Sequence, residues 1–388
     1  MNTDLPALQI KLRDFMNRVV IPREREFIGH FTLEQLETVR SELQAAGRES
    51  GLWLPQLPVE LGGLGLPWVK AYKLFIEAGR SMLGPQALNI AAPDEGNMHL
   101  LHVVANEAQK EKWLMPLTRG EIRSCFSMTE PPPGAGSDPS MLQASAVKEN
   151  GVWKLEAKKW FISGAWSAAV TLILAKTAEG ATIFLIPMNH PKIVLKRVIP
   201  TLDHFSPGGH CELDFDGLEL TDDDVLGESG KGFDYAQIRL DPARLTHCMR
   251  WLGIAMRSLE YAEEYALNRS SFGKKLAEQQ MVQQMIADSH IEIFASQTMI
   301  EQACRILDAG QRVRHEASMT KVFVSEAVNK IIDRSIQIMG STGISEDYPV
   351  SSFYKEARPF RIYDGANEVH RMSIARRAFR RAEARNQP

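Results

Sequence analysis

Hydrophobic residues in the first 120 or so positions recur with the spacing of amphipathic helices. In the run 32–46 they follow one another at three- and four-residue steps, at Leu33, Leu36, Val39 and Leu43. This spacing places them on one side of a helix, for which Thr32 is a suitable start and Gly47 a suitable stop. The Gly-rich run 61–66 predicts a turn, because no strand precedes it as a phosphate-binding loop requires.

Short β-like runs replace the helical pattern between about residues 152 and 220. Cys211, Leu213 and Phe215 alternate with polar residues, as in a strand that buries one face. Turns rather than helices separate these runs. The pattern therefore predicts a compact antiparallel β-domain and not a parallel, Rossmann-like sheet.

Helical spacing returns after Gly232 and continues toward the C-terminus. The run 324–339 carries one apolar or small stripe and ends at Gly340, a suitable helix stop. Similar runs cover about 244–268 and 277–308. The order helical, β, helical predicts an α+β fold with three domains. We place them at residues 1–123 (helical), 124–233 (β-barrel-like) and 234–388 (a helical bundle of four helices).

Composition and charge exclude several classes of partner. The chain has 388 residues, is 44% hydrophobic and carries a formal net charge of -3, which predicts no binding to nucleic acid. The 4 cysteines include no CxxC pair, and His99 and His102 lack further ligands nearby, so we expect no metal site and no disulfide framework.

The N-terminus and the apolar runs decide the expected compartment. The first residues have neither the apolar core of a signal peptide nor the character of a transit peptide. No unbroken apolar run approaches the roughly 20 residues that span a bilayer. We therefore expect a cytoplasmic protein without membrane insertion, whose partners are small molecules or proteins.

Four motifs occur in order along the chain. They are CFSMTEPPPGAGSD at 125–138, KWFISGA at 159–165, RSSFG at 269–273 followed by Gln280, and QIMGSTG at 337–343 with RIYDGANEVH at 361–370. Together with the helical–β–helical order, these motifs resemble the acyl-CoA dehydrogenase family across essentially the whole chain. Stretches such as AAPDEGNMHLLH and LDPARLTHCMR resemble the branch of family members 10 and 11.

The resemblance implies FAD as cofactor. Around Met128 and Thr129 the chain is expected to address the pyrimidine edge of the flavin, while Phe161 packs on the ring and Ser163 bonds N5. The first motif is two residues longer than the family's TEPxAGSD loop, and Phe161 replaces the usual tryptophan but keeps a flat apolar face. The cofactor residues that the resemblance implies are Phe126, Met128, Thr129, Ser137, Phe161, Ser163, Arg269, Phe272, Gln280, Gln337, Gly340, Ser341, Ala366 and Glu368.

The third motif also implies an oligomer. In the family, the residues that match Arg269, Phe272 and Gln280 reach the FAD of a neighbouring subunit, and arginine suits a pyrophosphate because its planar fork donates two bonds. The resemblance therefore implies a homo-oligomer, a tetramer or a dimer. The alternative is an ordinary surface arginine with a packed phenylalanine.

Asp364 matches the position of the family's catalytic glutamate. Removing the proton alpha to a thioester carbonyl needs a carboxylate within hydrogen-bond reach and donors for the charge that develops on oxygen. The β-hydrogen then leaves as hydride to flavin N5. The aspartate arm is shorter by about 1.5 Å, and such a displacement can be kinetically large. Some branches place the base near LDPAR, but that position is Ala243 here; an Asp-Gly turn is the alternative.

Other candidates have less specific roles. Arg244 is expected to orient the active-site loop or the acyl-CoA thioester, or to form a structural ion pair. Ser137 is expected near the pyrophosphate and the mouth of the substrate site. Glu130 is expected to be a structural turn carboxylate rather than a second base. The run 227–232 lacks the Ser or Thr that would complete a P-loop.

Three functions compete. The first is an FAD-dependent acyl-CoA dehydrogenase of fatty acid metabolism, which passes its electrons to an electron-transferring flavoprotein. The second is a flavin oxidase of the nitroalkane-oxidase type, which also uses an aspartate base. The third is a non-catalytic scaffold, which would purify without yellow FAD, and the nearly complete flavin motifs count against it.

Overall fold

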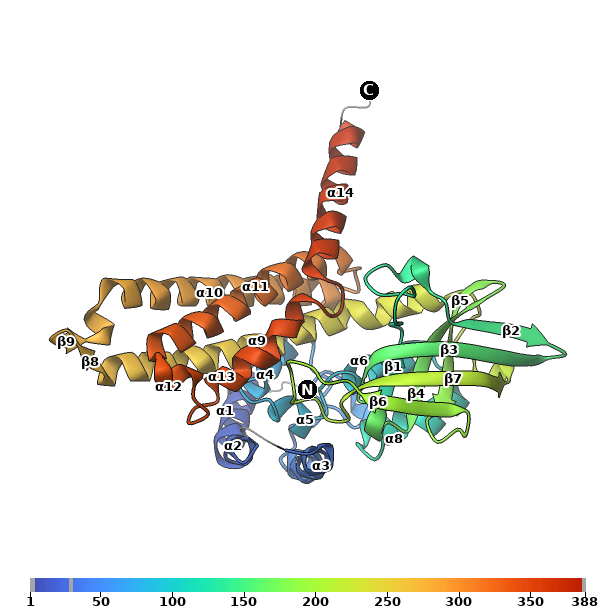
Figure 1. The fold of residues 1–388 in the computed structure, drawn as a ribbon, viewed down its shortest axis with the longest axis horizontal. Helices are drawn as coiled ribbons and strands as arrows, with labels where there is room; N and C mark the ends of the chain where they lie inside the picture. The colour runs from blue at the N-terminus through green and yellow to red at the C-terminus, as the bar shows by residue number, and fades with distance from the viewer. Residues whose placement is uncertain (1–3, 28–30, 386–388) are drawn as a thin grey trace.

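The computed structural model describes residues 4–27 and 31–385. The outer ends of the first and third predicted domains, 1–3 and 386–388, lie outside the described residues. Helices come first, a sheet follows, and long helices return, which confirms the predicted α+β order (Figure 1). The sheet lies at one end of an elongated body, and the long helices reach the other end.

Helices form the first part of the chain. They are α1 Leu5–Phe15, α2 Ile21–Arg25, α3 Leu33–Glu49, α4 Trp68–Ala78, α5 Gly84–Ala87, α6 Asp94–Val104, α7 Glu107–Gln109 and α8 Met115–Thr118. Thr32 caps α3 as predicted, in a reciprocal capping box with Gln35. The predicted stop at Gly47 is wrong, because α3 continues to Glu49. A Cβ at Gly47 would lie 2.0 Å from the Ala87 carbonyl oxygen, so the glycine serves close helix packing instead.

The middle part is a mixed sheet. Its strands are β1 Ser124–Ser127, β2 Ser145–Glu149, β3 Val152–Ser163, β4 Val170–Thr177, β5 Gly180–Pro187, β6 Ile193–Val198 and β7 His210–Leu220. The order is β1-β4-β2-β3-β7-β6, with β5 paired to β4. Most pairs are antiparallel as predicted, but β1 runs parallel to β4 and β2 makes one parallel bridge to β4. The chain forms β2 and β3 between β1 and β4, so that β4 can run in the same direction as β1.

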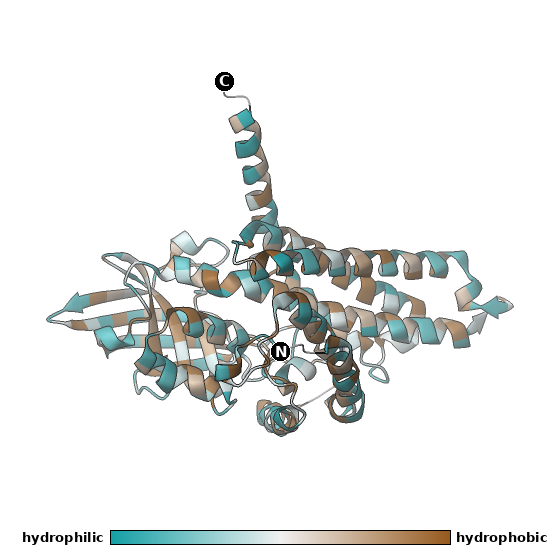
Figure 2. Ribbon diagram, turned by 180° about the vertical axis from the view of Figure 1, so that it is seen from behind, coloured by the Kyte–Doolittle hydropathy of each residue, from teal (hydrophilic) through white to brown (hydrophobic). Residues whose placement is uncertain are grey.

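Three long helices dominate the last part. The elements are α9 Gly232–Asn268, β8 Ser270–Ser271, β9 Lys274–Lys275, α10 Gln280–Asp308, α11 Arg314–Met339, α12 Ser341–Ile344, α13 Val350–Ala357 and α14 Asn367–Arg385. Helices α9, α10 and α11 lie side by side, whereas α14 extends away from them (Figure 1). In Figure 2, α14 is mostly hydrophilic, while hydrophobic stretches mark the body. No helix in the described ranges is long and apolar enough to cross a bilayer.

Helix α4 fixes the position of α9 by direct backbone contact. A Cβ at Gly79 would lie 2.4 Å from the carbonyl oxygen of Arg250, and a Cβ at Gly253 would lie 2.2 Å from that of Ile76. Only glycine permits this approach at both positions. Since α9 carries several of the candidate site residues, α4 sets where they stand.

Candidate active site

The loop between α13 and α14 presents Asp364 in a strained backbone conformation. Its φ is +52°, which is uncommon for a residue other than glycine. The Asp364 carbonyl oxygen accepts hydrogen bonds from Arg244 Nε at 3.0 Å and from His370 Nε2 at 3.1 Å. Lys321 Nζ donates to the next carbonyl, that of Gly365, at 2.8 Å. Helices α9, α11 and α14 therefore hold the loop in a conformation that an isolated chain would avoid.

The Asp364 carboxylate is half-buried, with Oδ2 shielded from solvent, and it is only loosely engaged. Its Oδ2 lies 3.2 Å from His247 Nε2, but the ring N–H points poorly toward it, so Oδ2 makes no hydrogen bond to any described residue. Burial alone raises the pKa of Asp364, but the nearby His247 ring and the guanidinium groups of Arg239 and Arg244 outweigh it and hold that pKa below its ordinary value. The result is an ionised carboxylate with a free lone pair, which is what a proton acceptor requires.

Arg244 contacts both the Asp364 loop and a neighbouring acid. Its Nε holds the Asp364 loop, while its Nη1 forms an ion pair of 2.9 Å with Asp241 one turn earlier on α9. Burial lowers the pKa of Arg244, although the two aspartates oppose that shift. Arg244 therefore holds the loop that carries Asp364. Only its Nη2 takes no part in these two contacts.

Two further arginines of α9 surround the carboxylate with positive charge. Arg239 stacks over the ring of Phe126 at 4.3 Å and donates to Asn97 Oδ1 at 2.7 Å. Arg250 donates to the Ile90 carbonyl oxygen at 2.8 Å, while its Nη2 has no partner among the described residues. Arg239 thus links the first predicted flavin residue to the neighbourhood of Asp364.

The predicted flavin loop is held from behind by a buried lysine. Lys159 Nζ, at the end of β3, donates to the Met128 carbonyl oxygen at 3.2 Å and to Glu130 Oε1 at 2.8 Å. Trp160 donates its backbone N–H to the Thr129 carbonyl at 3.1 Å. The N–H and hydroxyl of Thr129 make no hydrogen bond to described residues, so they are free to bind the polar edge of a ligand.

Phe161 has the features expected of a residue that packs against the face of a flavin ring. It lies at a register shift of β3 between Lys159 and Ile162, its φ is +51°, and 45% of its surface is exposed. A bulky residue with positive φ and an uncovered aromatic face is unusual in a strand. Beside the free donors of Thr129, this face fits the apolar wall that a flavin ring needs, so the residues present fit FAD.

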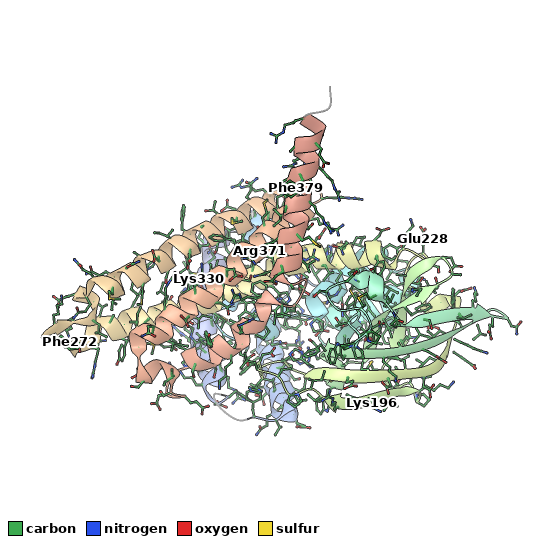
Figure 3. The ribbon with its side chains drawn as sticks, turned by 45° about the horizontal axis from the view of Figure 1, so that its top comes forward. Lys196, Glu228, Phe272, Lys330, Arg371 and Phe379 are labelled. Carbon is green, nitrogen blue, oxygen red and sulfur yellow. The ribbon has the colours of Figure 1, made fainter. Side chains whose placement is uncertain are left out.

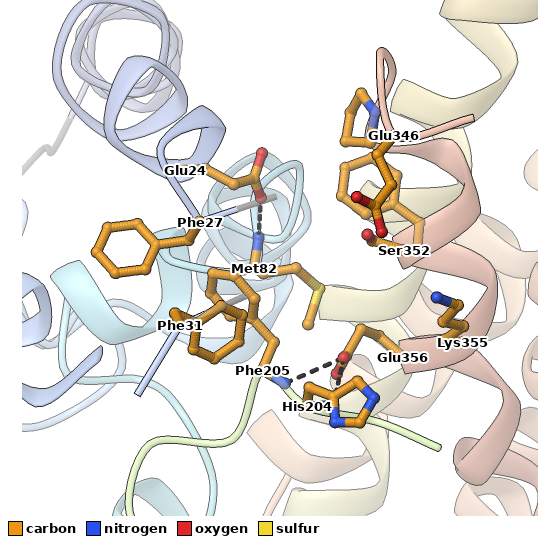
Figure 4. Close-up of a pocket in the computed structure, with 12 residues that line it drawn as sticks. Glu24, Phe27, Phe31, Met82, His204, Phe205, Glu346, Ser352, Lys355 and Glu356 are labelled. Carbon is orange, nitrogen blue, oxygen red and sulfur yellow. Dashed lines mark hydrogen bonds between the residues drawn. The ribbon is translucent and has the colours of Figure 1, made fainter. Parts of the chain in front are cut away.

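Ser163 is joined to a histidine and an aspartate that the sequence did not suggest. Ser163 pairs directly with His210 across β3 and β7, and its Oγ lies 2.8 Å from His210 Nδ1. His210 Nε2 lies 3.0 Å from Asp203 Oδ2. Asp203 precedes a loop held by Glu356 of α13, as Figure 4 shows; Glu356 accepts the backbone N–H groups of His204 at 2.6 Å and of the next residue at 3.0 Å.

Glu130 is a structural carboxylate, as predicted. Besides Lys159, it accepts the backbone N–H groups of Gln143 at 2.7 Å and Ala144 at 2.8 Å. Its own N–H donates to the Ala135 carbonyl oxygen at 2.8 Å and closes the loop. The residues that lengthen this motif are accommodated in the exposed part of that closed loop, so the positions around Met128 are undisturbed.

The predicted cofactor residues fall into two groups. The near group lies in β1, directly after β1, and in β3, and it contains Phe126, Met128, Thr129, Phe161 and Ser163. The far group is exposed at the opposite end of the long helices and contains Arg269, Phe272, Gln280, Gln337, Gly340 and Ser341.

The distance between the groups is large. Along α9, Arg244 and Arg269 are separated by roughly 37 Å at 1.5 Å per residue. Phe272, at the tip of the β8–β9 hairpin, has 97% of its surface exposed (Figure 3) and a φ of +52°. One chain therefore does not bring the two groups into a single site.

The remaining candidates lie apart from both groups or have other roles. Ser137 is exposed on the loop after β1, and at the start of α14 Ala366 is half-buried and Glu368 exposed. Burial lowers the pKa of His99 to about 4. Within the ranges described, no cluster of His, Cys, Asp or Glu could hold a metal ion.

Sequence reasoning missed three functional candidates. Lys159 and Lys321 are fully buried, and nothing local distinguishes them from exposed lysines. His247 could have been found, because it follows Ala243 by four residues and therefore lies on the same face of the helix near LDPAR.

The chain matches known proteins along its length. Models of the acyl-CoA dehydrogenase N-terminal, middle and C-terminal domains match residues 3–121, 125–218 and 230–379. "Probable acyl-CoA dehydrogenase FadE2" of Mycobacterium tuberculosis (strain ATCC 25618 / H37Rv) is 35% identical, over 96% of this chain and 95% of its own length. The solved butyryl-CoA dehydrogenase of Megasphaera elsdenii is 26% identical with a TM-score of 0.86, covering 98% of this chain and 99% of that one.

The predicted branch is confirmed as well. Family members 10 and 11 are similar to the chain; member 11 of Gallus gallus is 34% identical over 95% of this chain. The chain spans only 49% of that relative's length. With three domain models matched in order, the chain belongs to the acyl-CoA dehydrogenase family of FAD-dependent oxidoreductases.

Proposed function

We propose that this chain oxidises an acyl-CoA thioester to the trans-2-enoyl-CoA, with Asp364 as the base that removes the α-proton. The observation that carries this proposal is the state of the Asp364 carboxylate, which is half-buried and ionised and has a shielded oxygen without a hydrogen bond to described residues. Such an oxygen inside a protein calls for an explanation, and a place for a substrate proton supplies one.

The near group would hold the flavin of FAD. Phe161 offers its exposed face to the ring, Thr129 its free donors to the pyrimidine edge, and Ser163 its hydroxyl to N5. When bound, FAD supplies the acceptor for the β-hydride. The chain's own residues position the thioester between that acceptor and Asp364, and they exclude water by the burial around Arg239 and Arg244.

The far group would serve the FAD of a second copy of the chain. Arg269, Phe272 and Gln280 are exposed about 37 Å from the base region, where a neighbouring molecule can reach them. Gln337, Gly340 and Ser341 are exposed as well. The active enzyme is then a homo-oligomer, a dimer or a tetramer, and its electrons pass to an electron-transferring flavoprotein.

A flavin oxidase is the second candidate, since aspartate at position 364 also suits that chemistry. The two are separated by the fate of the reduced enzyme. Purified holoenzyme is titrated without oxygen against a panel of acyl-CoA thioesters while the flavin absorbance is followed, and air is then admitted. We expect bleaching by at least one thioester and slow reoxidation. Rapid reoxidation in air, or bleaching by nitroalkanes alone, would support the oxidase instead.

Asp364→Asn tests the assigned base. It keeps the shape of the side chain and removes its basicity, so we expect bound FAD with bleaching slowed by at least ~10³-fold. Asp333→Asn, at an exposed position of α11, is the matched control. Unchanged bleaching in Asp364→Asn would remove this residue from the mechanism.

A further inference from the structure

The ring of His247 lies directly beside the Asp364 carboxylate. It lies on α9, four residues after Ala243, and its Nε2 is 3.2 Å from Asp364 Oδ2. Its ring lies 4.8 Å from that of Tyr363 and 5.9 Å from that of Phe360, so aromatic neighbours from the base loop fix its orientation. No role in the family motifs described above involves this residue.

Burial and the neighbouring arginines keep this histidine neutral near pH 7. Burial, followed by the charge of Arg250, lowers the pKa of His247 to about 4, although Asp364 opposes that shift. The charged groups that face the pair are Arg239, Arg244 and Arg250 from α9, Glu95 from α6 and Lys321 from α11. Since an ionised carboxylate only accepts hydrogen bonds, the ring hydrogen belongs on Nε2.

The length of the acid matters for this contact. Glutamate at position 364 would extend the side chain by about 1.5 Å, toward a ring nitrogen that is already 3.2 Å from Oδ2. The aromatic packing leaves His247 little freedom to retreat. The ring therefore limits both the length of the acid and the directions that its carboxylate can take.

We propose that His247 is a positioning residue that aims the Asp364 carboxylate and restricts position 364 to a short acid. The inference rests on the proposed role of Asp364 as base. The bent contact leaves one lone pair of Oδ2 free for the substrate proton, while the ring blocks rotation of the carboxylate away from it. Since the ring approaches from α9, this helix contributes to the base even though Ala243 carries no acid.

Two substitutions with different hydrogen-bonding ability test the aiming role. His247→Gln retains an N–H donor at similar reach, and His247→Phe retains the aromatic packing without a donor. We expect kcat to fall at least tenfold in His247→Phe and less than threefold in His247→Gln. The acid limb of the pH profile should move to higher pH in His247→Phe, because losing the donor raises the pKa of Asp364. His247→Leu replaces His247→Phe if that variant does not fold, as judged by retained FAD absorbance and thermal unfolding.

A double-mutant cycle tests the restriction on length. Asp364→Glu should lose at least tenfold in kcat, and Asp364→Glu with His247→Ala should be more active than Asp364→Glu alone, because the smaller residue makes room. Wild-type kcat and an unchanged acid limb in His247→Phe would overturn the aiming role. A fully active Asp364→Glu with His247 in place would overturn the restriction. Either failure, with Asp364→Asn still inactive, leaves the proposed function intact; an active Asp364→Asn removes both.

Discussion

The two groups of predicted cofactor residues differ in how the chain supports them. Behind the near group, Lys159 and Lys321 are buried and fix the backbone carbonyls of Met128 and Gly365. In the far group, Phe272 is almost fully exposed at a hairpin tip. The backbone around the near group and Asp364 is therefore preorganised within one chain.

This difference shows which parts of the proposed site one chain can stabilise by itself. Strained conformations at Phe161 and Asp364 persist because buried hydrogen bonds surround them. Phe272 has a similar backbone strain without such surroundings. Its positive φ belongs to the two-residue turn between β8 and β9, in which both central residues take positive φ. Substitutions that support the near group should therefore cost folding free energy, and those in the far group should not.

The largest expected loss of stability follows from removing Lys159. Lys159→Met leaves the buried carboxylate of Glu130 without its cation, which costs about 3–5 kcal/mol of unfolding free energy. Lys158→Met, at the exposed neighbouring position of β3, is the control and should cost less than about 0.5 kcal/mol. Urea unfolding measures both. Equal stability of the two variants would contradict the assigned support of the flavin loop.

Glu356, which holds the loop that follows Asp203, makes a pH-dependent contribution to the unfolding free energy. Burial raises the pKa of Glu356 from its ordinary 4.5 to about 8, although the backbone N–H groups of His204 and Phe205 oppose the shift. The folded state then keeps a proton that the unfolded state has lost, so this contribution to stability falls as pH rises from about 4.5 to about 8. The slope is at most roughly 1.4 kcal/mol per pH unit.

Glu356→Gln tests this term, because the amide keeps an acceptor oxygen and does not titrate. Unfolding measured at several pH values should show a flatter profile than that of the wild type across the same window. A slope identical to that of the wild type would mean that Glu356 is already ionised in the folded protein.

A smaller loss is expected for Lys321→Met. It leaves the Gly365 carbonyl without its buried donor and removes one of the two donors of Asn367 Oδ1, at a cost of about 1–3 kcal/mol. Activity should fall as well, since Gly365 adjoins the base. Lys330→Met, exposed on the same helix, serves as the comparison in thermal unfolding and in kcat. Full activity of Lys321→Met would show that the loop keeps its conformation without this support.

The smallest change in stability is predicted in the far group. Arg269→Ala should alter the unfolding free energy of the apoprotein by no more than about 0.5 kcal/mol. It should nevertheless lower the FAD absorbance per mole of protein after gel filtration, because a second copy loses a donor for its cofactor. Lys274→Ala on the same hairpin is the control. Full FAD content in Arg269→Ala would contradict a site shared between chains.

Sequence patterns predicted the element order because helical and strand periodicities are local, whereas the assignment of Asp364 as the base came from the family resemblance and stays a prediction. Helix α3, its Thr32 cap and strand β7 are each determined by residues close together in the sequence. The chain of Ser163, His210 and Asp203 was not predictable, since it depends on the register of β3 against β7. Burial of Lys159 likewise depends on the packing of the whole sheet. The predicted stop at Gly47 was wrong because this glycine allows close packing against α5 and does not end its own helix.

Helix α9 is one uninterrupted helix of 37 residues that bears Arg244 and His247 near one end and leads into Arg269 at the other. Inserting or deleting a single residue between them would turn the far end by about 100° relative to the near end. The hairpin would then face a different direction, although every side chain in it remained. The length of this segment is therefore constrained as strictly as its sequence, and length variation in related chains should be confined to the loops.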